Sequence, residues 1–192
     1  MTTTSEKYKD CFGFTQEEVF ASLEEFGLSG RKQAVKNWYD GFTFGSETDI
    51  YNPWSIINYL DKKKIGVYWA NSSSNNLAGK LIQEGSSEIK QAMEELLSGK
   101  PLITKIDEQI VYSQLDENDS AVWSLLLAGG YLKVIYHGEY PEKEENGILA
   151  EPEYELVLTN LEVKLMFQTM IRGWFGKERT HYNDFIMGSC WG

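Results

Sequence analysis

The residues of this chain best suited to binding chemistry are Asn52, Pro53 and Trp54, inside the aromatic-rich stretch WYDGFTFGSETDIYNPWSIINYL at 38–60. Asn52 can cap a helix with its side chain, and Pro53 suits the first helical position because its missing N–H would have no partner there. Free N–H groups and partial positive charge at a helix start attract anions. The pattern therefore predicts a helix start that faces a ligand held elsewhere. The alternative is an aromatic corner that only packs two helices.

Other patterns that support catalysis are incomplete. None of the Gly-Lys pairs has the glycine spacing and the following Ser or Thr of a phosphate-binding P-loop. The only histidines, His137 and His181, have no partner at metal-ligand spacing, so no zinc site is expected. Gly-x-Ser-x-Gly is absent, and no Cys/His pair suggests a nucleophile. We therefore expect no catalytic residue and no metal site in this chain.

A metal-dependent nuclease would carry an acid on one strand and a Glu-x-Lys triplet on the next. Glu162-Val163-Lys164 matches the triplet, but it falls in a predicted helix without an acidic strand before it. We interpret the match as chance. Paired acids such as Glu17-Glu18 and Glu94-Glu95 fall on predicted exposed helix faces, where solvation explains them.

The composition is that of a globular protein. The chain has 192 residues, 42% of them hydrophobic and 14% aromatic, which is enough for one domain or two small ones. A net charge of −11 argues against a general surface for nucleic acid or anionic membrane. The start of the chain lacks a signal-peptide core, and no apolar run approaches the ~20 residues of a membrane span. Two cysteines, Cys11 and Cys190, imply no disulfide framework, and a cytoplasmic location is expected.

The first half of the chain is predicted to be nearly all helical. A capping box at Thr15 begins one helix, Ser29 begins a second, and Asp40-Gly41 ends it. An irregular loop then leads to a third helix from about Pro53 to Leu60. In that helix Trp54, Ile57 and Leu60 fall on one apolar face. Two more helices are expected through Leu77–Ile82 and from Ser86 or Ser87 to Gly99.

The pattern changes after Pro101. Short strands are expected at 102–106, 109–112, 131–136 and 154–158, with a helix at 121–128 and a last helix capped by Asn160. A Gly-, Pro- and Glu-rich tip at 137–152 separates the last two strands. The order helix, strand, acidic tip, strand, helix resembles a winged-helix unit. The expected fold class is mainly α with a small β component.

Six ordered blocks resemble one known family, the bacterial AAA-ATPase-like proteins that usually carry a PD-(D/E)XK nuclease-like domain downstream. The blocks are FGFTQEEV (12–19), WYDGFTFG (38–45), IYNPWSIINYL (50–60), YWANSSSN (68–75), VWSLLLAGGYL (122–132) and YELVLTNLEV (154–163). The resemblance spans residues 8–175. It departs from the family pattern at Thr43, where a large polar residue is more usual, and at Thr159-Asn160, which replaces a common Pro-Asn.

The resemblance implies that this chain is the C-terminal part of an ATPase module, since the family's Walker A and Walker B motifs lie upstream of the first block. It implies a helical lid-like subdomain at 12–100, a winged-helix-like subdomain at 101–175 and an irregular tail at 176–192. It also implies ATP and Mg for the full-length parent, with no cofactor in this chain. By likeness to a Gly-x-Pro helix start in related ATPases, Asn52, Pro53 and Trp54 are expected to lie near the nucleotide. The implied partners are the upstream nucleotide-binding core and the downstream nuclease-like domain.

The sequence is compatible with three functions. The first is a piece of a nucleotide-dependent switch, with the lid closing over ATP held by the upstream core. The second is a binding module without nucleotide dependence; the acidic tip at 139–155 favours a protein partner over DNA. The third is a self-contained hydrolase, which the missing catalytic patterns disfavour.

Overall fold

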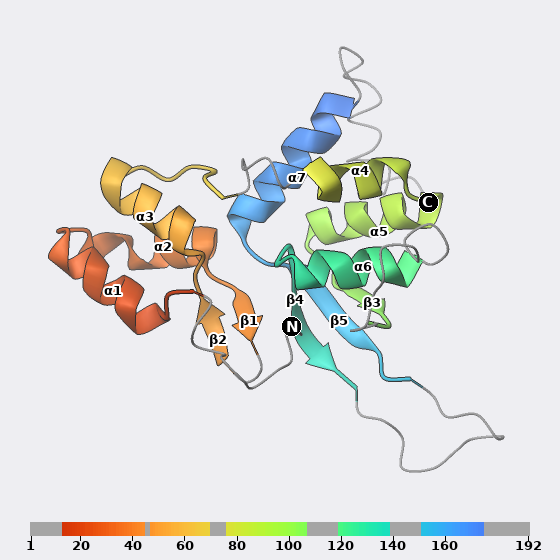
Figure 1. The fold of residues 1–192 in the computed structure, drawn as a ribbon, viewed down its shortest axis with the longest axis horizontal. Helices are drawn as coiled ribbons and strands as arrows, with labels where there is room; N and C mark the ends of the chain where they lie inside the picture. The colour runs from red at the N-terminus through yellow and green to blue at the C-terminus, as the bar shows by residue number, and fades with distance from the viewer. Residues whose placement is uncertain (1–12, 45–46, 70–75, 107–118, 139–150, 175–192) are drawn as a thin grey trace.

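The computed structural model describes residues 13–44, 47–69, 76–106, 119–138 and 151–174, and over these ranges the chain is mainly helical with a small antiparallel sheet in its C-terminal half, as expected. The α-helices are α1 (Gln16–Glu25), α2 (Lys32–Tyr39), α3 (Pro53–Lys62), α4 (Asn76–Glu84), α5 (Ser87–Ser98), α6 (Asp119–Ala128) and α7 (Leu161–Trp174), and η1 (Ser29–Arg31) is a 3-10 turn. The strands are β1 (Phe42–Phe44), β2 (Glu47–Ile50), β3 (Leu102–Thr104), β4 (Leu132–His137) and β5 (Tyr154–Leu158). Figure 1 shows α1–α3 and the β1–β2 hairpin on one side and the remaining elements on the other.

The first group of elements surrounds its own hydrophobic core. The capping box at Thr15 and Glu18 begins α1 as predicted, with both reciprocal hydrogen bonds present. The buried members of this first core are Val19, Leu23, Val35, Tyr39, Tyr51, Ile56 and Tyr59. Tyr39 also donates its hydroxyl hydrogen to the Gly66 carbonyl and accepts the Gly66 N–H, which fastens the segment after α3 to α2.

The prediction of an irregular loop between α2 and α3 is wrong in one respect, because this segment contains the antiparallel hairpin β1–β2. Its strands are too short for a sequence period to show. Contacts from distant parts of the chain stabilise them: the Phe42 ring lies 5.7 Å from the Trp69 ring and fits against the bare backbone of Gly130. Tertiary packing, not local preference, therefore forms this hairpin.

The predicted apolar face of α3 is also wrong. Ile56 and Tyr59 are the large side chains that α3 buries, whereas 59% of Trp54 and 53% of Ile57 are exposed. Both faces of the helix carry large apolar residues, so spacing alone could not identify the inner one. The consequence is an exposed apolar strip beside the N-terminus of α3.

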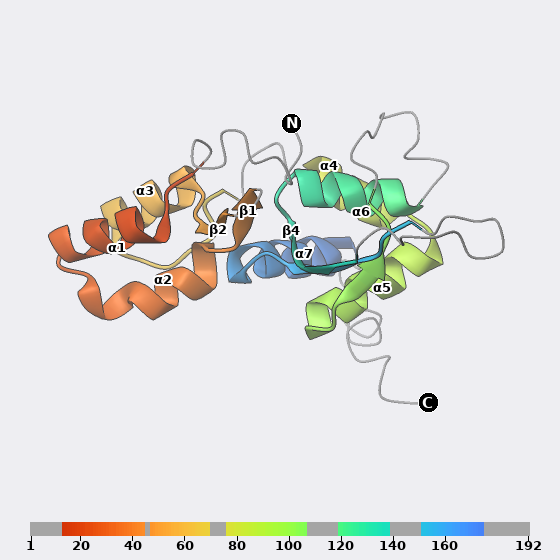
Figure 2. The same ribbon diagram turned by 90° about the horizontal axis from the view of Figure 1, so that it is seen from below.

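The second group of elements packs around the three-stranded sheet, in which β5 lies between β3 and β4 and pairs antiparallel with both. Helices α4–α7 cover it, and the second core includes Met93, Leu126, Leu156 and Phe167. Figure 2 shows α6 and α5 on opposite sides of the β4 and β5 ribbons.

The two cores meet at residues 67–69, because Val67 and Trp69 pack against the second core and Tyr68 packs against the first. Residues of α4 and α5 belong to the second core. The subdomain boundary expected at 101 stays a prediction. Several predictions fall on residues outside the described ranges: those for Cys11, the strand at 109–112, most of the acidic tip, the tail at 176–192, His181 and Cys190. Within the described ranges no helix combines the length and apolar character needed to cross a membrane.

Candidate functional site

The start of α3 has the capping geometry that the sequence predicts. The Asn52 side-chain oxygen accepts hydrogen bonds from the N–H of Trp54 at 2.9 Å and of Ser55 at 3.4 Å, and Pro53 occupies the first turn. The Ile56 N–H donates to the Asn52 carbonyl. A nucleotide contact at Asn52, Pro53 and Trp54 stays a prediction.

The expectation of free N–H groups at this helix start is wrong. Pro53 has no N–H, and the next three amides all bond to Asn52. Asn52, which begins the helix, thus also occupies the N–H groups of the first turn, so they are not available to a ligand. What α3 presents to a partner is the exposed ring of Trp54, the Pro53 ring and the helix dipole.

The first turn of α3 is fastened to the first turn of α7 by Glu162. The Glu162 side chain is buried, with 1% of the residue exposed, and it accepts a hydrogen bond from the Ser55 hydroxyl at 2.7 Å. Its other oxygen accepts the backbone N–H groups of Tyr68 and Trp69. A buried carboxyl group needs such partners because it has lost its water. Glu162 therefore joins α3, the segment after it and α7 at one point.

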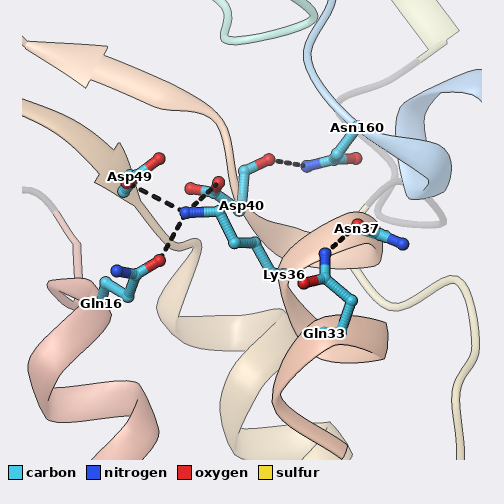
Figure 3. Close-up of polar contacts among 7 residues, drawn as sticks. All are labelled: Gln16, Gln33, Lys36, Asn37, Asp40, Asp49 and Asn160. Carbon is cyan, nitrogen blue, oxygen red and sulfur yellow. Dashed lines mark hydrogen bonds and ion pairs between the residues drawn. The ribbon is translucent and has the colours of Figure 1, made fainter.

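A second polar cluster lies where α1, α2 and the β1–β2 hairpin meet (Figure 3). The Lys36 ammonium group donates to the Asp49 carboxylate at 3.0 Å and to the Gln16 side-chain oxygen, and it lies 3.7 Å from the Asp40 carboxylate. Asp49 has a positive φ of 60°, a left-handed conformation that is costly for a residue other than glycine. The surrounding contacts therefore hold Asp49 in place to pair with Lys36.

Asp40 and Asp49 share this site unequally. Burial, which is the larger cause, and the neighbouring Asp49 carboxylate together raise the pKa of Asp40 to about 6. The pKa of Asp49 is lowered despite its partial burial, chiefly by its hydrogen bond from Lys36. We assign the shared proton to Asp40 because 9% of its side chain is exposed, against 40% for Asp49. One Asp40 oxygen has no hydrogen-bond partner among the described residues, so the protonated form is the less costly one there.

The turn after α2 is anchored to the turn before α7. The Asn160 side-chain amide donates to the Asp40 carbonyl at 3.0 Å, and its oxygen caps α7 by accepting the Val163 N–H. Gly41 has φ 118°, and a side chain there would collide with the Thr159 carbonyl. Only glycine satisfies both conditions. The predicted stop at Asp40-Gly41 and the predicted cap at Asn160 are therefore confirmed, and both lie at the junction between the two cores.

The sequence did not identify Ser55, Lys36, Asp49 or the binding role of Glu162. In the sequence Glu162 stands out only as part of a Glu-x-Lys triplet, because its partner Ser55 is 107 residues away. One signal was available: Glu162 lies four residues before Met166, a core position of the predicted helix, so the two side chains share one side of the helix. Burial of the Glu162 carboxyl group would then require a partner.

The described residues contain no group of three or more His, Cys, Asp or Glu side chains arranged to hold a metal ion. His137 is exposed, and its ring lies 5.8 Å from the Tyr154 ring. The geometry of the described site supports binding and mechanical linkage. No family model, curated protein or solved structure matches this chain.

Proposed function

We propose that this chain is the lid and winged-helix-like part of an AAA/STAND-like ATPase, and that it couples the nucleotide state to a downstream nuclease-like domain without being catalytic alone. The observation that supports this best is the Glu162 linkage between α3 and α7. α3 carries the exposed Trp54 beside the half-buried Pro53, and α7 is the last described helix of the sheet-containing unit.

In this proposal the nucleotide bound by the upstream core contacts α3 through Trp54 and Pro53. A shift of α3 pulls on Ser55, and the buried Glu162 transmits the movement to α7. Coupling of this kind requires the two nucleotide states to differ in their contacts with α3. The Asn160–Asp40 bond provides a second connection between the same two parts.

The reading frame around the chain gives the first test. Walker A and Walker B motifs directly upstream support the proposal, and a frame without them overturns it. Calorimetric titration of the 192-residue chain with ATP and magnesium should show no binding. A micromolar affinity would contradict the claim that the nucleotide site lies elsewhere.

The second test uses the protein encoded by the full reading frame. Trp54→Ala should weaken ATP binding several-fold, while Ile135→Ala, which removes an equally exposed apolar side chain from β4, should leave it unchanged. Equal effects of the two substitutions would show that α3 has no special place near the nucleotide.

A second candidate is a protein-interaction module without nucleotide dependence. Ile103 on β3 and Tyr136 on β4 are exposed and both pair with Glu155 on β5, so they share one face of the sheet. Exposed apolar residues gathered on one face are typical of interaction sites. Tyr136→Ser should then weaken partner binding with or without ATP. Salt-sensitive binding of duplex DNA in a filter assay would instead indicate the nucleic-acid form of this candidate.

A further inference from the structure

A cleft of about 490 Å³ lies at the junction between the two cores, away from the exposed face of α3. Its walls come from the end of α2, the end of α5, strand β4 and the β5–α7 turn, and its lining residues include Lys36, Lys133, Lys164, Asn37, Leu96 and Leu158. The volume is within the range of small-molecule sites, roughly 300–1,000 Å³. Its lining combines apolar and polar side chains, as such sites do.

The charge of the lining is opposite to that of the protein. Three lysines line the cleft against one carboxyl group, Asp40, whereas the chain as a whole has a net charge of −11. Lys133 and Lys164 are half-buried, and neither forms an ion pair within 4.0 Å or a side-chain hydrogen bond with any described residue. The Lys133 ammonium group attracts the Asp49 carboxylate from a longer distance. Partial burial of an ammonium group that forms no close ion pair is unfavourable, so an anion placed between the two lysines would stabilise them.

Two further features favour a negative ligand. The Asn37 side-chain oxygen already accepts a hydrogen bond from Gln33, so the group that Asn37 can still offer to a ligand in the cleft is its amide donor. The cleft also borders the first turn of α7, a 14-residue helix whose N-terminus carries partial positive charge. The net charge of −11 and the size of the cleft disfavour a nucleic-acid polyanion.

We propose that this cleft binds a small organic anion with two or more phosphate or carboxylate oxygens, held between Lys133 and Lys164. The apolar walls contact the rest of the ligand. This site is separate from the nucleotide contact proposed for α3, and it does not depend on an upstream ATPase core.

The test uses the 192-residue chain with two probes, pyrophosphate and citrate, against sodium chloride of equal ionic strength. Either probe should raise the melting temperature and shift the backbone amide resonances of Lys133 and Lys164 in a saturable way. The double substitution Lys133→Gln and Lys164→Gln should weaken that binding at least tenfold. Lys80→Gln, on an exposed part of α4, should not.

The response to the two probes identifies the ligand class: pyrophosphate alone indicates a phosphate ligand, and citrate alone a polycarboxylate. Absence of a response to both, or an equal response in the double variant, overturns the proposal. Circular dichroism checks that the double variant is folded, and the single variants Lys133→Gln and Lys164→Gln replace it if it is not. A positive result without Walker motifs upstream would support this site while refuting the proposed function.

Discussion

Replacement of Glu162 by alanine is the sharpest test of how the two cores are joined. The substitution leaves the Ser55 hydroxyl and the amides of Tyr68 and Trp69 without their shared acceptor in a buried place. Removal of one member of a buried charged network costs about 3–5 kcal/mol, because the remaining groups stay desolvated. A typical domain has only about 5–15 kcal/mol of stability, so this loss is a large fraction of it.

The measurement is urea unfolding followed by far-ultraviolet circular dichroism. Glu162→Ala should lower the free energy of unfolding by about 4 kcal/mol, and Glu162→Gln by about half of that, because one amide oxygen can still accept. Glu25→Ala, on the exposed face of α1, should stay within about 0.5 kcal/mol of the wild type.

Two further measurements locate the effect. A double-mutant cycle with Ser55→Ala should give a coupling energy of about 1 kcal/mol or more. Hydrogen exchange at the Tyr68 and Trp69 amides should accelerate more in Glu162→Ala than exchange in the second core does. If Glu162→Ala destabilises the protein by less than about 1 kcal/mol, as ordinary surface changes do, the carboxyl group does not hold the junction together.

Three other outcomes are expected. Because the pKa of Asp40 is raised to about 6, the folded state holds a proton that the unfolded state loses near pH 4, so this contribution to stability is lost as pH rises between those values. Asp40→Asn, which resembles the protonated form, should flatten the pH dependence of the urea midpoint between those pH values. It should also raise the free energy of unfolding at pH 7 by about 1–3 kcal/mol. If the midpoint of the variant depends on pH as that of the wild type does, the proton does not reside on Asp40. Gly41→Ala should lower stability by about 2 kcal/mol or more, because it adds a collision to a strained φ, whereas Gly30→Ala, which meets no atom within 4 Å, should be neutral or slightly stabilising in thermal melts. Trp54→Ala should leave the melting temperature of this chain nearly unchanged because most of its side chain is exposed, and a large drop would place its ring in the core.

Local sequence signals predicted four helix starts well, because the groups involved are within a few residues of one another. The start of the second helix at Ser29 is wrong, because Ser29 begins η1 and α2 begins at Lys32. Thr15, Asn52, Ser86 and Asn160 all cap the helices expected of them. Capping depends on a short side chain that reaches the next turn, and tertiary contacts rarely change that geometry.

Local sequence patterns did not predict the buried side of α3 or the β1–β2 hairpin, because distant parts of the chain determine both. α3 carries large apolar residues on both sides, and only its packing against α1 and α2 selects the side with Ile56 and Tyr59. The hairpin depends on Phe42 meeting the backbone of Gly130, far along the chain. No period in the sequence contains that information.

The polar connections between the two cores have one feature in common: each lies at a helix end. Glu162 is in the first turn of α7 and reaches the first turn of α3, and Asn160, the cap of α7, reaches the residue that ends α2. Helix ends have unpaired backbone groups and fixed positions, so a capping residue can also bond to a neighbouring element. A movement of α3 would therefore act on α7 at its N-terminus, beside the lysine-lined cleft.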